Sequence, residues 1–384
     1  MSQGGGWGGG GLGYQAGDHF RSLRLRASPG FPVPALIRSR SSLGCDWKAS
    51  VMRVFRSSHA DAVWREAWTA VREDGIRRAN AAKGDSMELL HCSFGIDDAR
   101  QRWVLSRTPP LNPAFAIAEI VWILNGRRDA AFLTAWNTSL GTFAGNAAEL
   151  HGAYGHRLKS HLGFDQLRRA AEVLSADSDQ RQVVLQVWDS TVDFPNSDGS
   201  PTSEDVPCNI CAIVKVSDGR LEWLQVMRSN DLVLGLPYNL LQWTTLQEVL
   251  AGWLQLEVGT YNHISDSLHV YDRDFDRFDV TAGSSWPRND DDLRLPLEQS
   301  LEVFAVLEDA IESLGGATTS NQVLEVLDGT DVPEPYKNLL LVMASERCRR
   351  LGSYTQAISL FGLIKNEAIA ACLRMWYERL GFSL

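Results

Sequence analysis

From residue 52 onward, apolar and polar positions follow two periods, one typical of helices and one typical of strands. Apolar residues at spacings of three and four predict helices over residues 61–74, 112–124, 165–174 and 238–254, and mostly helix over 295–384. Asn112 fits an N-cap before Pro113, and Gly126 stands just past the predicted end of that helix. Asp165 fits the N-cap of the next helix. These signals therefore predict helix ends as well as helices.

Short runs rich in β-branched and aromatic residues predict the strands. They cover residues 87–95, 182–188, 211–216, 221–227 and 263–271. The turn Ser217-Asp218-Gly219 joins the third and fourth runs into a hairpin. Because strands and helices mix without strict alternation, the pattern predicts an α+β fold in which helices cover one mixed β-sheet.

The first 51 residues differ in composition from the rest of the chain. Eight of the first 13 residues are Gly, and an Arg- and Ser-rich stretch follows. Such a composition offers too little apolar surface to fold, so we interpret residues 1–51 as a disordered N-terminal extension. A transit peptide is the alternative, and whether the mature protein keeps this segment stays open. We expect a main domain over residues 52–293, with a helical C-terminal segment over residues 294–384 packed on it.

Composition and charge narrow the classes of function. The chain has 384 residues, 44% of them hydrophobic, with 37 Lys and Arg against 47 Asp and Glu. A net charge of −10 disfavours a general nucleic-acid binder, although a local basic pocket remains compatible with it. We find no apolar run of the length, about 20 residues, that a membrane span needs. Six cysteines are too few for a disulfide scaffold in this chain and favour a reducing compartment, the cytoplasm.

The predicted hairpin carries the clearest chemical signal. Pro207 and Cys208 stand just before its first strand, and Arg228 with Ser229 stands just after its second. A hairpin returns both ends to the same side of a sheet, so the Arg228 guanidinium would favour the nucleophilic thiolate of Cys208. Arg228 with Ser229 also suits a phosphate group. Core packing for the cysteine and a capped turn for the arginine are the alternatives.

Cys208 and Cys211 form a C-x-x-C pair, which raises the question of zinc or redox chemistry. Residues three apart in a strand point to opposite faces, and zinc needs a second ligand pair at matching spacing. The candidate for that second ligand pair is the two adjacent residues His91 and Cys92. The redox motif normally opens a helix, whereas a strand is predicted here. We therefore expect no metal.

Outside the hairpin, an acidic residue interrupts an otherwise very apolar predicted helix at Glu119. Burying a carboxylate that has no partner lowers the stability of a fold by roughly several kcal/mol. A glutamate at this position therefore indicates function. Asn239, after Pro-Tyr, has an N-cap as its alternative reading. The alternative for His269 is a histidine that packs in the core with its hydrogen bonds satisfied. Tyr271 would suit a strand whether or not it has a role in binding.

In order and spacing, these blocks resemble the thymidylate synthase family. The resemblance rests on Pro207-Cys208, Arg228-Ser229-Asn230-Asp231, Gly235-Leu236-Pro237-Tyr238-Asn239, His269-Val270-Tyr271, Glu119 with Trp122, Gly152-Ala153-Tyr154-Gly155-His156-Arg157, and Arg181 before a strand. It spans roughly residues 83–274, about half of the chain.

The resemblance implies transfer of a one-carbon unit from the co-substrate 5,10-methylenetetrahydrofolate to C5 of a pyrimidine nucleotide. The implied catalytic residues are Cys208 as the nucleophile at C6, Glu119 as the proton-handling acid, and Tyr154. The implied nucleotide ligands are Arg228, Ser229, Arg181 and Lys83 at the phosphate, Asn239 at the base, and His269 and Tyr271 at the sugar 3′-hydroxyl. The implied folate ligands are Asp231, Gly235 and Trp122. Because the family takes its arginine loop from the other subunit, Arg181 implies a homodimer with shared sites.

Some positions depart from the family pattern. Gln182 stands where a second arginine is usual, Lys83-Gly84 is a weak match to the family's Arg-Gly loop, and Asn209 stands where histidine is common. The tryptophan expected near the folate is not evident in residues 133–146, and the closing C-terminal tail is missing. A closed, dry site favours hydride transfer over attack by water, so these departures keep a hydroxymethyl product open.

Three hypotheses of function follow. Methylation of dUMP leads, and uracil is favoured as the base because the Asn239 amide can both donate and accept hydrogen bonds. Hydroxymethylation of dUMP, dCMP or CMP is the close second, and a nucleotide-binding homologue without turnover is the third. The expected partners are a pyrimidine nucleoside monophosphate, a folate and a second copy of the chain, with neither a membrane nor a specific nucleic acid.

Overall fold

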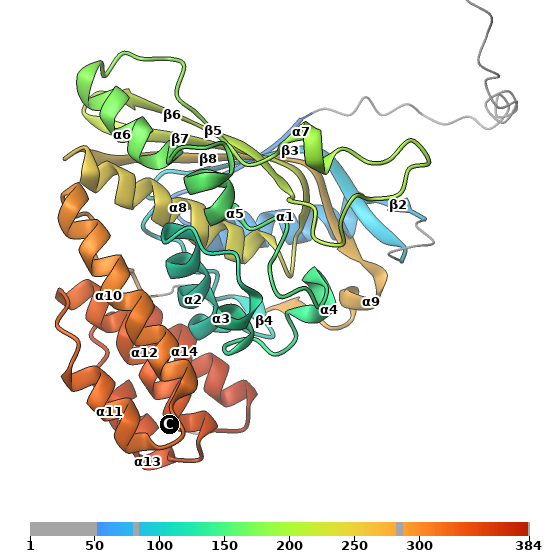
Figure 1. Cartoon of the computed structure of the whole chain (residues 1–384). Coiled ribbons are helices and arrows are strands. Elements are labelled where there is room, and N and C mark those ends of the chain that lie inside the picture. Colours follow the sequence, from blue (N-terminus) through green and yellow to red (C-terminus); the bar gives the residue numbers. More distant parts are fainter. Residues whose placement is uncertain (1–51, 80–83, 282–286, 383–384) are drawn as a thin grey trace, which may run out of the picture. The chain divides into compact units, whose positions relative to one another are not determined.

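The computed structural model describes residues 52–79, 84–281 and 287–382, and the described residues belong to one compact unit (Figure 1). The extension expected over residues 1–51 and the predicted phosphate ligand Lys83 lie outside the described residues. None of the helices in the described ranges is long and apolar enough to cross a bilayer.

A seven-stranded mixed sheet forms the framework, in the order β1-β3-β8-β7-β6-β5 with β2 beside β3. The β1–β3 and β7–β8 pairs are parallel and the others antiparallel. The strands are β1 Arg53–Ser57, β2 Ile76–Arg78, β3 Ser86–Ile96, β5 Val184–Gln186, β6 Asn209–Ser217, β7 Arg220–Asp231 and β8 Glu257–Tyr271. A small second sheet pairs β4, Arg107–Thr108, with β9, Asp279–Val280. The predicted α+β fold with one large mixed sheet is confirmed.

The helices that matter most for the site lie on one face of this sheet. Helix α1, Ala60–Asp74, packs on β1 and β3, and α8, Leu236–Trp253, packs on β7 and β8 (Figure 1). Helix α2, Pro113–Leu124, packs against α8. The Asn112 side chain accepts from the N–H of Phe115 and caps α2, as the sequence predicts.

Shorter helices lie in the connections. They are α3 Ala130–Thr134, α4 Gly141–Ala144, α5 Tyr154–His156, the π-helix Arg157–His161, α6 Gln166–Ala176, α7 Ser190–Asp193 and α9 Asp272–Phe275. The Asp165 side chain caps α6 by accepting from the N–H of Arg168, again as predicted.

Five C-terminal helices pack together and onto α2. They are α10 Leu297–Gly316, α11 Ser320–Asp328, α12 Glu334–Arg350, α13 Tyr354–Phe361 and α14 Glu367–Arg379 (Figure 1, orange to red). Helices α10, α12 and α14 each contact α2. The Arg350 guanidinium donates to the carbonyl oxygens of Ala135 and Trp136 over 2.6 and 2.7 Å. The C-terminal segment is thereby tied to the chain that follows α2.

Where β3, β8 and β7 run side by side, the large sheet has an irregularity, here called the kink, at which the alternation of buried positions shifts by one residue. His91 has a φ of 57°, and its Nδ1 lies 2.8 Å from Asp266 Oδ1 across the β3–β8 pair. In β8 the buried positions are odd-numbered up to Ser265 and even-numbered from Leu268. In β7 the same switch falls between Met227 and Asn230. Beyond the kink, the strands therefore turn a different set of side chains away from the helices.

Candidate active site

The β6–β7 hairpin brings Cys208 and Arg228 together, as the sequence predicts. The backbone N–H of Arg228 donates to the Cys208 carbonyl over 3.0 Å. The Arg228 guanidinium donates through Nε to the Pro207 carbonyl and through Nη2 to the Val206 carbonyl, over 3.0 and 3.1 Å. It also lies over the Trp188 ring, 5.4 Å from its centre. Arg228 therefore holds in place the backbone that presents the thiol.

Tyr154 lies near the thiol. Burial raises the pKa of its phenol well above the ordinary value, and the nearby Cys208 and Asp205 raise it further. The phenol therefore keeps its proton beside Cys208 and can act as a hydrogen-bond donor. The next residue, Gly155, has no room for a side chain, because a Cβ there would clash with the carbonyl oxygen of Ile123.

A buried ionic brace fixes the segment that carries Tyr154. The Arg157 guanidinium is 1% exposed and donates through both Nη atoms to Asp193, at 2.8 Å from Oδ1 and 3.1 Å from Oδ2. His151 Nε2 lies 2.7 Å from Asp193 Oδ1. The Gly152 N–H donates to Asp205 Oδ2 over 2.8 Å, three residues before Cys208. Hydrogen bonds to charged groups thus join the segment that carries Tyr154 to the chain just before Cys208.

Glu119 faces this cluster from α2. All other residues of α2 are buried, and Glu119 alone in that helix is partly exposed, although its Oε2 is buried. Burial raises the pKa of the Glu119 carboxyl to about 7, and a hydrogen bond with Gln242 of α8 opposes the rise. A carboxyl with a pKa near neutrality can both give and take a proton. Gln242 is a neighbour of a candidate site residue that the sequence analysis missed.

Asn239 lies inside α8, so the alternative reading of it as an N-cap is wrong. The N-cap is Gly235, and Pro237 in the first turn needs no N–H donor of its own. Asn239 Nδ2 donates to Asn230 Oδ1 over 3.2 Å. Asn230 Nδ2 in turn lies 3.2 Å from His263 Nε2 and 3.1 Å from Ser265 Oγ. The sheet thereby orients the Asn239 amide.

Beyond the kink, four candidate residues share one face of the sheet. Ser229 and Asp231 stand two apart in β7, as do His269 and Tyr271 in β8, and Asp231 pairs with His269 in the register. The His269 and Tyr271 rings meet edge to face with centres 5.0 Å apart. Burial raises the pKa of Tyr271, and Asp231, Arg273 and Cys208 are among the groups near it.

Asp231 is held at the start of the turn into α8. Burial raises the pKa of its carboxyl. The backbone N–H groups of Val233 and Leu234 oppose this rise, because each donates a hydrogen bond to Oδ1 over 2.9 Å. A Cβ on Gly235 would stand 3.1 Å from the Asp231 carbonyl oxygen, so the turn has little room for a larger residue there. Asp231 and Gly235 therefore form one compact turn.

Two predicted residues stand apart from this cluster. Arg181 lies exposed in the loop before β5, and its guanidinium has no hydrogen-bond or salt-bridge partner among the described residues. Trp122 is buried on α2, one turn after Glu119, and its Nε1 donates to the Asp129 carbonyl over 2.9 Å. The indole N–H of Trp122 is thus already used within the fold.

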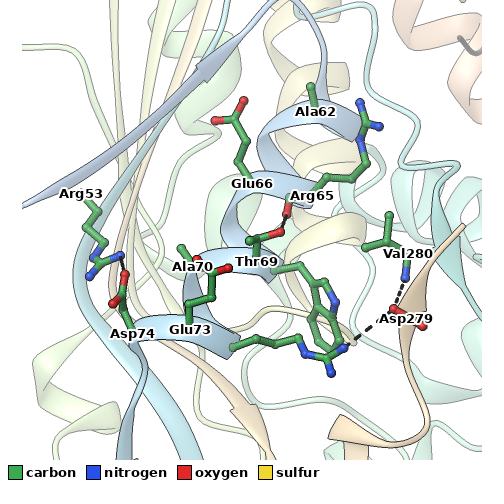
Figure 2. A pocket seen from close by; sticks show the side chains of 12 residues that line it. Arg53, Ala62, Arg65, Glu66, Thr69, Ala70, Glu73, Asp74, Asp279 and Val280 are labelled. Carbon is green, nitrogen blue, oxygen red and sulfur yellow. Dashed lines mark hydrogen bonds and ion pairs between the residues drawn. The ribbon is translucent and has the colours of Figure 1, made fainter. Parts of the chain in front are cut away.

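A separate hollow of about 820 Å³ lies along α1, between β1 and β9 (Figure 2). Side chains of both charges line it, among them Arg53 and Asp74, which pair over 2.8 Å. None of the candidate site residues belongs to its lining. It is therefore distinct from the Cys208 cluster.

Comparison with known proteins shows the family of this chain. The family model for thymidylate synthase matches residues 63–308, well over half of the chain, and the protein belongs to the thymidylate synthase family. The family uses methylenetetrahydrofolate as a co-substrate.

Several relatives have assigned activities. The deoxyuridylate hydroxymethyltransferase of Bacillus phage SP01 is 38% identical over 176 residues, which are 43% of this chain and 45% of that protein. The deoxyuridylate hydroxymethyltransferase of Pseudomonas phage M6 is 32% identical over 163 residues, 42% of this chain and 45% of that protein. The thymidylate synthase of Francisella philomiragia subsp. philomiragia is 24% identical over 216 residues, 52% of this chain and 76% of that protein. The chain thus spans less than half the length of the two phage relatives.

Proposed function

We propose that this protein transfers a one-carbon unit from 5,10-methylenetetrahydrofolate to C5 of dUMP through a covalent adduct of Cys208. The observation that carries the proposal is the placement of the Cys208 backbone against Arg228, with Tyr154 and the Glu119 carboxyl close by. Addition of the thiolate to C6 makes C5 nucleophilic, which the free base is not. A pure nucleotide-binding protein needs neither a thiol nor a near-neutral carboxyl at this place.

The nucleotide would be bound by groups that the sheet already orients. Arg228 and Ser229 face the phosphate, His269 and Tyr271 the sugar 3′-hydroxyl, and Asn239 the O4 and N3 edge of uracil. The Asn239 bond to Asn230 supports this role, because it fixes which way the amide points. Lys83 remains a further proposed phosphate ligand.

The folate would be bound beside the turn from β7 to α8. Asp231 offers a carboxyl that burial inclines towards its protonated form, which suits hydrogen bonding to a pterin. Gly235 lets the backbone approach closely, and Trp122 contributes apolar surface through α2.

We favour 5-hydroxymethyl-dUMP as the product and keep dTMP as the second candidate. Two phage deoxyuridylate hydroxymethyltransferases share 38% and 32% identity with this chain, against 24% for the bacterial thymidylate synthase. The buried oxygens Glu119 Oε2 and Gln242 Oε1, which have no partner among the described residues, also favour a site that holds water.

The active unit is proposed to be a homodimer. The sheet face away from α1 and α8 carries Val54 and Val184, 68% and 49% exposed, and the partly exposed side chains of Leu224, Val226 and Ile264. Burying such a face against a second copy removes apolar surface from water. Arg181, exposed next to the β5 edge, would then reach the phosphate of the partner's site.

Two further assignments complete the proposal. Residues 52–293 are proposed as the catalytic domain, on which the helical segment 294–384 packs. The cytoplasm is proposed as the compartment, because a reducing environment keeps a catalytic thiol active, and none of the five described cysteines forms a disulfide.

The test is tritium release from C5-labelled dUMP with methylenetetrahydrofolate, with the product identified by mass. We expect release together with 5-hydroxymethyl-dUMP and tetrahydrofolate; dTMP with dihydrofolate would select methylation instead. Cys208→Ala should abolish release, whereas Cys211→Ala is the matched control and should retain it. Bound nucleotide without release from dUMP, dCMP or CMP would overturn both enzymatic proposals and leave the binding protein.

A further inference from the structure

We infer that Gln242 is a positioning residue which, with Glu119, holds the water that attacks the one-carbon unit, and so sets the hydroxymethyl product. The inference rests on the proposed function. Gln242 is 3% exposed and lies one turn after Asn239 on α8, so its side chain leaves the helix on the face that carries the base ligand. From there it meets the Glu119 carboxyl of α2.

The two side chains together present what a water molecule needs. Glu119 Oε2 and Gln242 Oε1 are both buried acceptors without a partner among the described residues. A water has two O–H donors, so one molecule can satisfy both oxygens. Its lone pairs then point away from the two acceptors, available to an electrophile.

An unpartnered oxygen alone would not make this case, as the same helix shows. Gln247 Oε1 also lacks a partner among the described residues. However, Gln247 Nε2 donates to the carbonyls of Leu221 and Gly259 over 2.8 and 3.2 Å, which ties that side chain to the sheet. Gln242 differs because its side chain meets a titratable carboxyl.

The proposed step balances in atoms and electrons. The water oxygen bonds to the exocyclic methylene carbon on C5, and one water proton passes to Glu119 Oε2. The electron pair of the exocyclic double bond moves to C5, restores the C5–C6 double bond and expels the Cys208 sulfur from C6 as thiolate. No oxidant or reductant is consumed, so tetrahydrofolate is the released folate.

The decisive variant is Gln242→Met, which keeps length and apolar packing but removes the amide. Wild type should give one 5-hydroxymethyl-dUMP for each tritium released from C5. In Gln242→Met we expect tritium release within about threefold of wild type and an unchanged KM for dUMP. The yield of hydroxymethyl product per tritium should fall at least tenfold, with 2-mercaptoethanol in the buffer trapping the methylene group as a thioether. Gln242→Asn, which withdraws the amide by one methylene, is the second variant and should lie between the two.

Gln247→Met is the matched control, because it removes a buried amide from the same helix. We expect it to lower the melting temperature while the ratio of product to tritium stays at one. A ratio of one in Gln242→Met, or tritium release and product falling together, would overturn the inference.

A readout that needs no turnover separates this inference from the proposed function. The carboxyl stretching band of Glu119, identified by its loss in Glu119→Gln, can be titrated by infrared spectroscopy. In Gln242→Met the pKa of Glu119 should rise above its wild-type value of about 7, because the opposing hydrogen bond is lost. An unchanged pKa would overturn the contact even in an active enzyme. If the pKa of Glu119 rises in Gln242→Met but the wild-type protein releases no tritium, the contact between the two side chains is upheld. The proposed function is then refuted, and with it the role of Gln242 in product choice.

Discussion

The N–H of Arg228 donates to the carbonyl of Cys208 over 3.0 Å, and this hydrogen bond joins the proposed phosphate ligand to the proposed nucleophile. The Arg228 guanidinium then reaches back to the carbonyls of Pro207 and Val206. The distance from the thiol to the proposed phosphate site is therefore set next to the end of a strand pairing, Asn209 with Met227, which is a rigid element.

Replacing Arg228 tests this coupling. Arg228→Ala should raise the KM for dUMP by about 10- to 150-fold, because a hydrogen bond to a charged group contributes about 1.5–3 kcal/mol. It should also lower kcat, since the backbone that carries Cys208 loses two hydrogen bonds. Steady-state kinetics measure both effects. Arg220→Ala, an exposed arginine at the other end of β7, is the control and should change neither; an unchanged KM in Arg228→Ala would refute phosphate binding.

Asn239→Asp should move the base preference from uracil to cytosine. An ionised Asp only accepts hydrogen bonds, so it suits the cytosine amino group and leaves the uracil O4 without a donor. We expect kcat/KM for dUMP to fall by about 5- to 150-fold, the effect of about 1–3 kcal/mol for an unmet polar group, while dCMP turnover rises. Asn262→Asp, on a partly exposed position of β8, should leave the dCMP-to-dUMP ratio as in wild type. A ratio that stays constant in Asn239→Asp would contradict the assigned role.

Glu119 should make the protein less stable as the pH rises. Its pKa is about 7 when folded against an ordinary value of 4.5, so the folded state holds the proton more tightly. The stability contributed by this proton is complete below about pH 4.5 and is lost between that pH and about 7. The full difference is on the order of 3 kcal/mol. Urea unfolding of Glu119→Gln and wild type should therefore show the variant gaining stability relative to wild type from pH 5 to pH 8; parallel pH profiles would speak against it.

Asp193→Asn should destabilise the whole domain. Asp193 is 1% exposed and balances Arg157, so its loss leaves a buried cation without a charge partner. We expect the free energy of unfolding to fall by about 3–5 kcal/mol. Asp97→Asn removes the exposed pair with Arg56 and should cost less than about 1 kcal/mol. Denaturant titration of both variants gives the comparison, and equal losses would argue against the brace.

Much of the fold could be predicted because its signals are local. The caps at Asn112 and Asp165 and the hairpin from β6 to β7 need only short stretches of sequence. The strand predicted over residues 182–188 is shorter in the structure, Val184–Gln186. The N–H groups of Val187 and Trp188 both turn to the Ile210 carbonyl, which ends the regular ladder.

The features that escaped prediction depend on partners distant in sequence. The kink at His91 breaks the alternation of buried positions, which is the signal used to assign the faces of a strand. Gln242 and Gln247 look equivalent as polar residues in a buried helix, and only the packing of α2 against α8 separates them. The placement of Cys208 beside Arg228, in contrast, followed from the hairpin and is present in the structure.

The packing of the C-terminal helices on α2 also fixes an order of events during synthesis. Helix α2, nearly all apolar, carries Glu119 but gains its neighbours α10, α12 and α14 only when the ribosome has translated residues 297–379. Until then the growing chain exposes an apolar surface of the kind that chaperones bind. The helix that carries Glu119 would thus be covered late in translation, after Cys208 and Asn239 have been made.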